Sequence, residues 1–383
     1  MPPIYLDYNA TTPIESSAAD AMIRCIRTVF GNPSSSHEFG AGARAEIDAA
    51  RVELGRLIGT SPRDIIFTGC ATEANNLAIR GLIPDCTAHG RHIITSAIEH
   101  PAVLEVCRYL ERSGAELTIL RVDERGVVDP DDVRAAIRPA TRLITIMHAN
   151  NETGVIQPIA EIAGIAREHG IPMHTDAAQS VGKIPVDMEC LGVDLLTIAG
   201  HKFGAPKGIG ALVVRSGLPL NRILHGAGHE NGRRPGTENL VGIVGLGAAS
   251  RFAREHLGEN TAHLLAMRDQ LEQMILGVCP SARVNSGGAP RLPNTSNIAF
   301  PGIDADDFIR EASAIAVSAG AACHSGTVTL SHVLKAMNVP MPLARGSIRF
   351  STGFQTTPND IRNACMCVCS ALKRLGVPIR EDE

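Results

Sequence analysis

Seven short runs rich in Ile, Leu, Val and Thr recur between residues 64 and 214, and helical patterns accompany several of them. The runs are 64–68, 92–95, 117–120, 143–147, 172–175, 194–198 and 209–214. Apolar residues share one helical face over 47–58 and over 158–166, and the glycines Gly59 and Gly170 end these patterns. Strands alternating with helices predict an α/β fold with a mostly parallel sheet covered on both faces. Ligands of such folds bind at the carboxyl ends of the strands.

The length of the chain points to more than one domain. Its 383 residues exceed a typical single domain, which predicts one large and one smaller domain. After Gly245 strand signals become sparse and Pro/Gly-rich pieces such as 286–290 appear. We therefore place the large domain at 16–250 and a smaller C-terminal domain at 251–383.

Composition excludes several classes of partner. The formal net charge is −4, and no basic stretch interleaved with aromatic residues occurs, which argues against direct nucleic-acid binding. No apolar run is long enough to span a membrane, and the N-terminus lacks a signal-peptide pattern, so we expect a cytosolic protein. The ten cysteines are then expected to be reduced thiols.

Three of these cysteines stand close together in the pattern Cys365-x-Cys367-x-Cys369, which could suggest a metal site. They fall within a predicted helix that runs from an N-cap at Thr357 to a stop at Gly376. Helical periodicity places two of the three on its apolar face. Core packing is the favoured interpretation, and no metal is expected.

Polar side chains follow five of the predicted strands. These are Ala71 and Thr72 in a small-residue turn, His100, Asn151, the pair Asp176 and Gln179, and the pair His201 and Lys202. Each group alone is weak evidence, because a single polar residue at a strand end is usually structural. Together they place an imidazole, an amide, a carboxylate, an amine and a phosphate cradle along one edge of one sheet.

Lys202 gives this edge its chemistry. The chain contains only four other lysines and otherwise uses arginine for positive charge, and lysine can form a Schiff base whereas arginine cannot. Pyridoxal 5'-phosphate (PLP) requires an amine for its aldehyde, a carboxylate for its pyridine nitrogen, an anion cradle and a stacking group. The Gly-rich fingerprint of nicotinamide cofactors is missing after the first strand. The edge therefore predicts a PLP site.

Ordered motifs along nearly the whole chain resemble the class V aminotransferase-like group of fold-type I PLP enzymes, which contains cysteine desulfurases and selenocysteine lyases. They include residues 5–13, 31–34, 150–154, 174–179, 200–202, 234–239, 320–323 and 347–351. The resemblance implies a large domain with a seven-stranded sheet, a small α+β domain, and an N-terminal segment, 1–15, packed near the active site.

The resemblance also implies roles for single residues. Lys202 bonds the cofactor aldehyde, His100 stacks on the ring and moves protons, and Asp176 pairs with the pyridine nitrogen. Gln179 and Asn151 contact the ring oxygen and the substrate side. Arg349 grips the substrate carboxylate, which suits its planar fork.

For the phosphate, the resemblance implies contacts from Ala71, Thr72 and His201. Thr237 is expected to reach the phosphate of a neighbouring subunit, which implies a homodimer. Two positions depart from the family pattern: Ala199 replaces a frequent serine, and Gly69-Cys70 precedes Ala71. These departures bear on cofactor affinity more than on the reaction.

Cys323 lies among small residues, 317–327, that fit a mobile loop better than a core. An exposed thiolate there could attack the sulfur of L-cysteine, keep it as a persulfide and leave L-alanine, which is the desulfurase reaction. The persulfide would pass to a protein acceptor that the sequence does not identify.

Other functions stay open at this point. Residues 320–325 resemble the selenocysteine lyase branch at least as well, and a lyase could release selenium from L-selenocysteine without a persulfide. A class V aminotransferase-like enzyme without sulfur transfer would not need Cys323. A scaffolding relative would be expected to lack the lysine, aspartate or cysteine, and this chain has all three.

Overall fold

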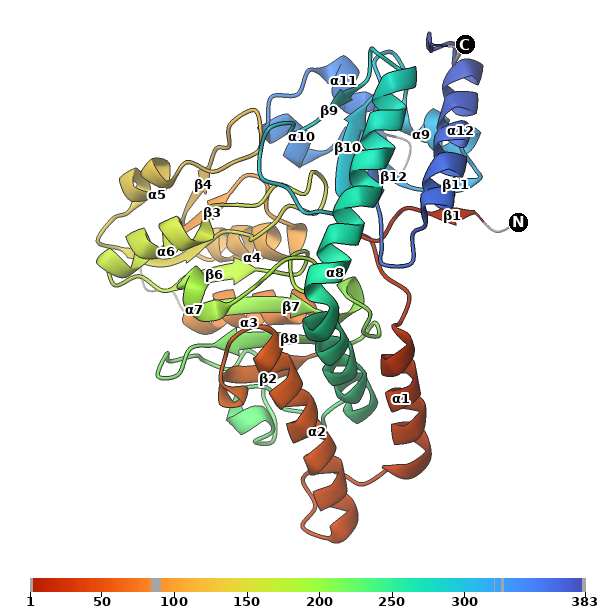
Figure 1. The fold of residues 1–383 in the computed structure, drawn as a ribbon. Coiled ribbons are helices and arrows are strands. Elements are labelled where there is room, and N and C mark those ends of the chain that lie inside the picture. Colours follow the sequence, from red (N-terminus) through yellow and green to blue (C-terminus); the bar gives the residue numbers. More distant parts are fainter. Residues whose placement is uncertain (1–2, 84–90, 320, 325–326, 381–383) are drawn as a thin grey trace.

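The computed structural model describes residues 3–83, 91–319, 321–324 and 327–380 (Figure 1). Its largest sheet has seven strands in the order β2-β8-β7-β6-β5-β3-β4. β8 runs antiparallel to both neighbours and the other pairs are parallel. The strands are β2 (Ile65–Thr68), β3 (His92–Ser96), β4 (Glu116–Leu120), β5 (Thr141–Thr145), β6 (Met173–Asp176), β7 (Leu195–Ala199) and β8 (Gly210–Val214). All seven predicted runs form this sheet, which confirms the mostly parallel α/β fold.

Helices cover both faces of the sheet because successive side chains of each strand point to opposite sides. On β7, Leu195 packs with helix α3 and Leu196 with the opposite cluster. α3 and α4 cover one face, and α2, α6 and the first part of α8 cover the other. The helices of this region are α1 (Ser16–Thr28), α2 (Glu38–Leu57), α3 (Ala71–Leu82), α4 (Pro101–Arg112), α5 (Pro130–Ala136), α6 (Ile159–Glu168) and α7 (Met188–Leu191).

Helix α8 (Leu240–Val278) crosses the boundary expected at residues 250 and 251. Its first part joins the core of the large sheet through Ile243 and Leu246, and its second part joins another cluster through Leu271 and Ile275. Figure 1 shows it running the length of the molecule. One helix therefore belongs to both cores, and the division into two domains stays a prediction.

The second core lies between a four-stranded sheet and helices. The sheet order is β12-β15-β10-β9, and β1 pairs with β11 beside it. These strands are β1 (Ile4–Tyr5), β9 (Arg283–Val284), β10 (Thr295–Ala299), β11 (Ile315–Ala316), β12 (Ser318–Ala319) and β15 (Ser347–Ser351). The helices of this core are α9 (Ala305–Glu311), α12 (Pro358–Arg374) and the second part of α8. The short helices α10 (His332–Ala336) and α11 (Met341–Arg345) instead place Val333, Leu334 and Ala344 in the core of the large sheet. The pairing of β1 with β11 fixes the start of the chain beside this second core. The segment that follows β1 then reaches the edge of the large sheet.

Helix α12 begins at the predicted cap. Thr357 and Asp360 form a reciprocal capping box, and Cys365 is buried on the apolar face with Val368. No disulfide joins the cysteines of the described part of the chain. Over those same residues, no helix is both long and apolar enough to cross a membrane.

Candidate active site

A cavity of about 320 Å³ opens at the carboxyl edge of the large sheet. It brings together groups from the ends of β2, β3, β5, β6 and β7, as well as Arg349 of β15. Of the sequence-predicted site residues, it is lined by Ala71, Thr72, His100, Asn151, Asp176, Gln179, His201, Lys202 and Arg349. Asn9 and Asn75 also line it, and sequence reasoning did not single them out.

Lys202 ends a 3-10 turn (Gly200–Lys202) that directly follows β7. Its Nζ donates to the backbone oxygens of Asn9, at 2.6 Å, and Ala10, at 2.9 Å. The pKa of this amine is lowered to about 8, mainly by burial and also by nearby Arg349, while Asp176 opposes the shift. A larger share of Lys202 is therefore uncharged near neutral pH than for an ordinary lysine, as a nucleophilic amine requires.

Asp176 lies at the end of β6 and is buried. Its Oδ2 accepts a hydrogen bond from Asn75 Nδ2 at 2.7 Å, and its Oδ1 accepts one from the backbone of Ala178 at 2.9 Å. Asn75 sits on the buried side of α3, where an asparagine between apolar residues was the only available signal. The carboxylate is held in one orientation and can face a protonated ring nitrogen.

His100 is the N-cap of α4, and its Nδ1 accepts a hydrogen bond from the backbone of Ala102 at 3.1 Å. This bond leaves the proton of a neutral ring on Nε2. Although His100 is exposed at the cavity, the surrounding protein desolvates the ring and lowers its pKa, and Asp176 opposes that shift. The ring is suited to stacking and to carrying a proton.

The N-terminus of α3 provides the predicted phosphate cradle. Cys70 is its N-cap and makes no side-chain capping bond, so first-turn N–H groups remain available for an anion. Close packing requires glycine at 210, because a Cβ there would lie 2.8 Å from the backbone carbon of Cys70 and 3.0 Å from the nitrogen of Ala71. His201 is close by, and burial lowers its pKa to about 4. These residues fit the phosphate of PLP.

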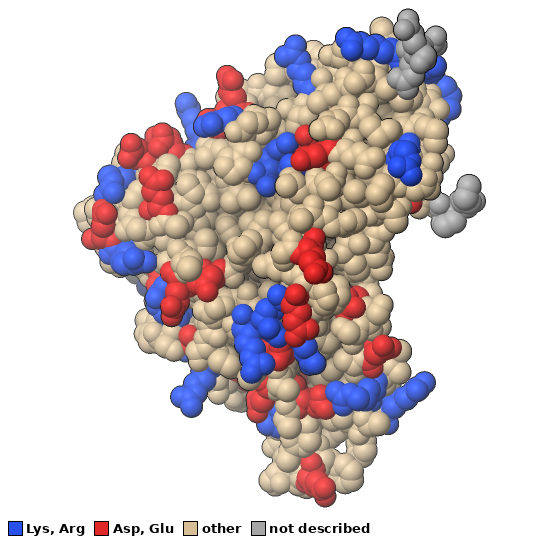
Figure 2. All heavy atoms as spheres, in the orientation of Figure 1, with Lys and Arg blue, Asp and Glu red and all other residues tan. Residues whose placement is uncertain are grey.

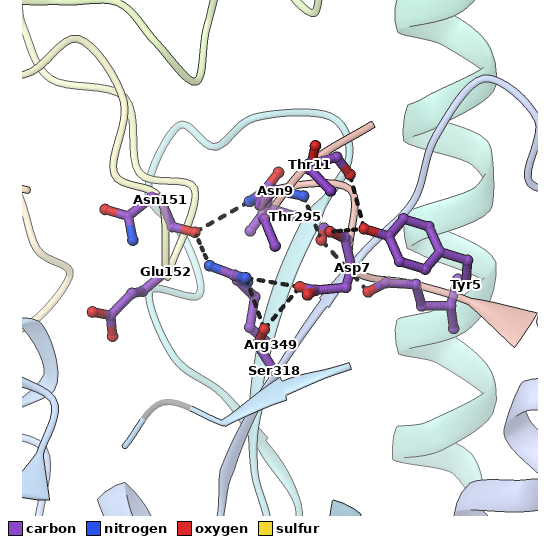
Figure 3. Close-up of polar contacts among 12 residues, drawn as sticks. Tyr5, Asp7, Asn9, Thr11, Asn151, Glu152, Thr295, Ser318 and Arg349 are labelled. Atoms are coloured by element: carbon purple, nitrogen blue, oxygen red, sulfur yellow. Dashed lines mark hydrogen bonds and ion pairs between the residues drawn. The ribbon is translucent and has the colours of Figure 1, made fainter. Parts of the chain in front are cut away.

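Arg349 lies between the cavity and the N-terminal segment (Figure 3). Its Nη1 donates to the Asn151 backbone oxygen at 3.0 Å, and its Nη2 donates to Asp7 Oδ1 at 2.8 Å and to Ser318 Oγ at 2.9 Å. Its buried Nε has no hydrogen-bond partner among the described residues. These bonds use three of the five guanidinium N–H groups, and Arg349 also lines the cavity. Asp7, which sequence reasoning placed in a motif without a role, holds this arginine through tertiary contacts.

The segment around Cys323 is not the loop expected from its small residues. Its backbone forms an antiparallel hairpin of β13 (Ala321–His324) and β14 (Thr327–Leu330), with Cys323 opposite Val328. The Cys323 side chain lies outside the described part of the structure. Ladder hydrogen bonds explain the difference, since a run of small residues can pair as strands without bulky packing partners.

Thr237 is exposed and is not among the described residues that line this cavity. The sequence expectation assigned it to the cofactor of a neighbouring subunit. That role stays a prediction.

The aminotransferase class-V family model matches residues 4–363. The chain belongs to the aminotransferase class-V family. A similar protein from Dictyoglomus turgidum, "Cysteine desulfurase IscS", is 45% identical over 94% of this chain and 91% of its own length. The solved structure "NIFS-LIKE PROTEIN" has a TM-score of 0.90 and 34% identity, covering 97% of this chain and all of that one. "SspA in complex with cysteine" has a TM-score of 0.82 and 38% identity, covering 92% and 99%.

Class-V aminotransferases depend on PLP, which is therefore the cofactor of this chain. The cavity fits this cofactor. It contains the amine of Lys202, the carboxylate of Asp176, the uncapped N-terminus of α3 and the guanidinium of Arg349.

Proposed function

We propose that this chain is a PLP-dependent cysteine desulfurase, which converts L-cysteine to L-alanine and takes the sulfur as a persulfide on Cys323. The observation that carries the proposal is Lys202 in a cavity with Asp176 and a partly unpaired Arg349. Relatives named as cysteine desulfurases match nearly the whole chain. The backbone of β12, which leads toward Cys323, is joined to Arg349 through Ser318.

The residues of the chain divide the work of the reaction. Arg349, which lines the cavity, binds the substrate carboxylate through its guanidinium, and Lys202 as a neutral amine removes the Cα proton. Bound PLP supplies an electron sink for the substrate carbon. The Cys323 thiolate attacks the substrate sulfur, so that a sulfur–sulfur bond forms while the Cβ–sulfur bond breaks and its electron pair stays with carbon. Protonation of that carbon, together with return of the proton from Lys202 to Cα, completes L-alanine.

The serine variant Cys323→Ser tests this proposal. With L-cysteine and a thiol reductant, wild type is expected to produce sulfide and alanine, whereas Cys323→Ser produces neither at a comparable rate yet still binds PLP. Sulfide release at the wild-type rate by Cys323→Ser contradicts the persulfide role. The same pair assayed with L-selenocysteine separates a lyase, because a lyase keeps its activity without the thiol.

We also propose that the enzyme is a homodimer in which Thr237 contacts the cofactor of the partner subunit. Large apolar side chains exposed just after α1 and near the start of α2 support this. Phe30 is 78% exposed and Phe39 60% exposed, and their rings lie 5.1 Å apart. A second copy would bury this patch.

A protein sulfur acceptor completes the proposed reaction, and its identity stays open. Direct nucleic-acid binding is not proposed, since Figure 2 shows Lys and Arg interspersed with Asp and Glu over the face in view. The cytosolic location expected from the sequence stays a prediction.

A further inference from the structure

Lys183 is a buried lysine that the proposed reaction does not use. It follows β6 by a few residues and is only 5% exposed. Burial lowers its pKa well below the usual range, and nearby Lys202 and Arg349 act in the same direction. Its backbone oxygen accepts a hydrogen bond from Thr261 of α8 at 2.8 Å, which fixes the position of the residue. A lysine in such a place needs partners for its amine.

The amine of Lys183 bonds two side-chain amides. Its Nζ donates to Gln179 Oε1 at 2.8 Å and to Asn9 Oδ1 at 2.9 Å. An amine with two or three hydrogens can make both bonds, so the arrangement does not depend on whether Lys183 is charged. Lys183 therefore holds the oxygen end of both amides.

The nitrogen end of the Gln179 side-chain amide is also held by a hydrogen bond. Its Nε2 donates to the backbone oxygen of Asn9 at 3.0 Å, and that oxygen can only accept. The same oxygen accepts the 2.6 Å hydrogen bond from Lys202 Nζ. The amide N–H₂ of Gln179 and the amine of Lys202 are thus neighbours in the cavity wall.

Asn9 is oriented in the same way. Its Oδ1 also accepts from Asn294 Nδ2 at 2.9 Å, and its Nδ2 donates to Thr295 Oγ1 at 2.8 Å. Removing Lys183 would leave the buried Oε1 of Gln179 without this donor and weaken the hold on Asn9.

We propose that Lys183 is a positioning residue for the cofactor, acting through the Gln179 amide. In PLP the phenolic oxygen is on the ring carbon next to the aldehyde-bearing carbon, so a donor beside Lys202 meets that oxygen. Lys183 keeps an N–H rather than a carbonyl oxygen at this place and so stabilises the ionised phenolic oxygen. The inference rests on the proposed use of PLP and not on the sulfur chemistry.

The test is a pH titration of the visible absorbance of the PLP-loaded enzyme without substrate. In Lys183→Met the phenolic oxygen loses its oriented donor and holds the neighbouring proton of the lysine–cofactor linkage more strongly. The titration midpoint is therefore expected to rise by about one pH unit, and PLP affinity to fall roughly tenfold. The exposed Lys335→Met, which does not line the cavity, serves as the matched control and is expected to leave both unchanged.

A double-mutant comparison separates positioning from general support of the fold. In a Gln179→Leu background, Lys183→Met is expected to add no further shift of the midpoint. A full additional shift, or a Lys183→Met enzyme that loses only thermal stability, overturns the proposal. If Lys183→Met does not fold, Gln179→Leu alone must raise the midpoint, and an unchanged midpoint overturns it. Absence of any visible band in wild type would instead contradict the use of PLP.

Discussion

At the scale of single residues, the site depends on how the protein changes the charge state of one amine. Lys202 is buried near the positive charge of Arg349, and both effects favour its neutral form. Its pKa of about 8 lies below the value of 10.5 for an ordinary lysine. The neutral amine is the form that bonds an aldehyde.

This lowered pKa predicts how cofactor uptake depends on pH. The rate at which cofactor-free enzyme bonds PLP is expected to rise as Lys202 loses its proton and to level off above about pH 8 to 9. An ordinary lysine would still gain reactivity up to about pH 10 to 11. Stopped-flow absorbance across this range measures the midpoint.

Two variants complete the measurement. Lys202→Ala should show no covalent band at any pH, whereas Lys335→Ala, at an exposed position outside the cavity lining, should behave as wild type. A rate that keeps increasing beyond pH 10 in wild type would contradict the lowered pKa.

Sequence reasoning reached Lys202, Asp176 and His100 because each lies at the end of a strand or within four residues after it, and parallel strands end at one edge. Asp7 and Lys183 carried no such signal. Their contacts with Arg349 and Gln179 join residues far apart in sequence or hidden in a turn. Nothing local marks such a contact.

At the scale of elements, the Cys323 hairpin is joined to the active site at both ends. Before it, Ser318 donates to Asp7 Oδ1 at 2.8 Å. After it, Ser331 caps α10 and its hydroxyl also contacts Glu152, while His332 Nε2 lies 2.9 Å from the Glu99 backbone oxygen. We infer that these contacts set the position of the hairpin relative to His100 and Asn151.

Ser331→Ala tests that inference. The change removes a helix cap, which is expected to lower the free energy of unfolding by about 1 kcal/mol. It also frees the end of β14, so persulfide formation on Cys323 is expected to slow severalfold while the PLP spectrum stays unchanged. Single-turnover mass spectrometry measures the persulfide.

A second cap serves as the control. Thr357→Ala removes the cap of α12, which contributes no residue to the cavity lining, and should cost similar stability without slowing the persulfide step. Equal effects of the two variants on that step would show that Ser331 acts through stability alone.

At the scale of the whole molecule, two cores share helix α8 and the N-terminal segment crosses between them. Asp7 bridges to Ser351 of the small sheet, while Asn9 bonds Lys202 of the large one. The cavity is therefore built from both cores. In the proposed dimer, the partner subunit would also contribute to the cofactor site.

The dimer makes a prediction that needs no substrate. Wild type is expected to sediment at about twice the 40.5 kDa chain mass. The double variant Phe30→Ser, Phe39→Ser should shift toward the single-chain mass and bind PLP more weakly. Ile119→Ser, an exposed apolar residue of edge strand β4, serves as the control. A fully dimeric phenylalanine variant contradicts the proposed interface.

The sequence by itself determined the seven-stranded α/β sheet and the placement of an amine, a carboxylate and an imidazole at its carboxyl edge. Both follow from local properties of the chain, namely its hydrophobic periodicity and the positions at which strands end. Tertiary structure decided the rest. Small residues near Cys323 paired as strands, and Asp7, Asn75 and Lys183 each gained a partner from a distant segment. Hydrogen bonds between such segments depend on three-dimensional packing, and no local pattern encodes them.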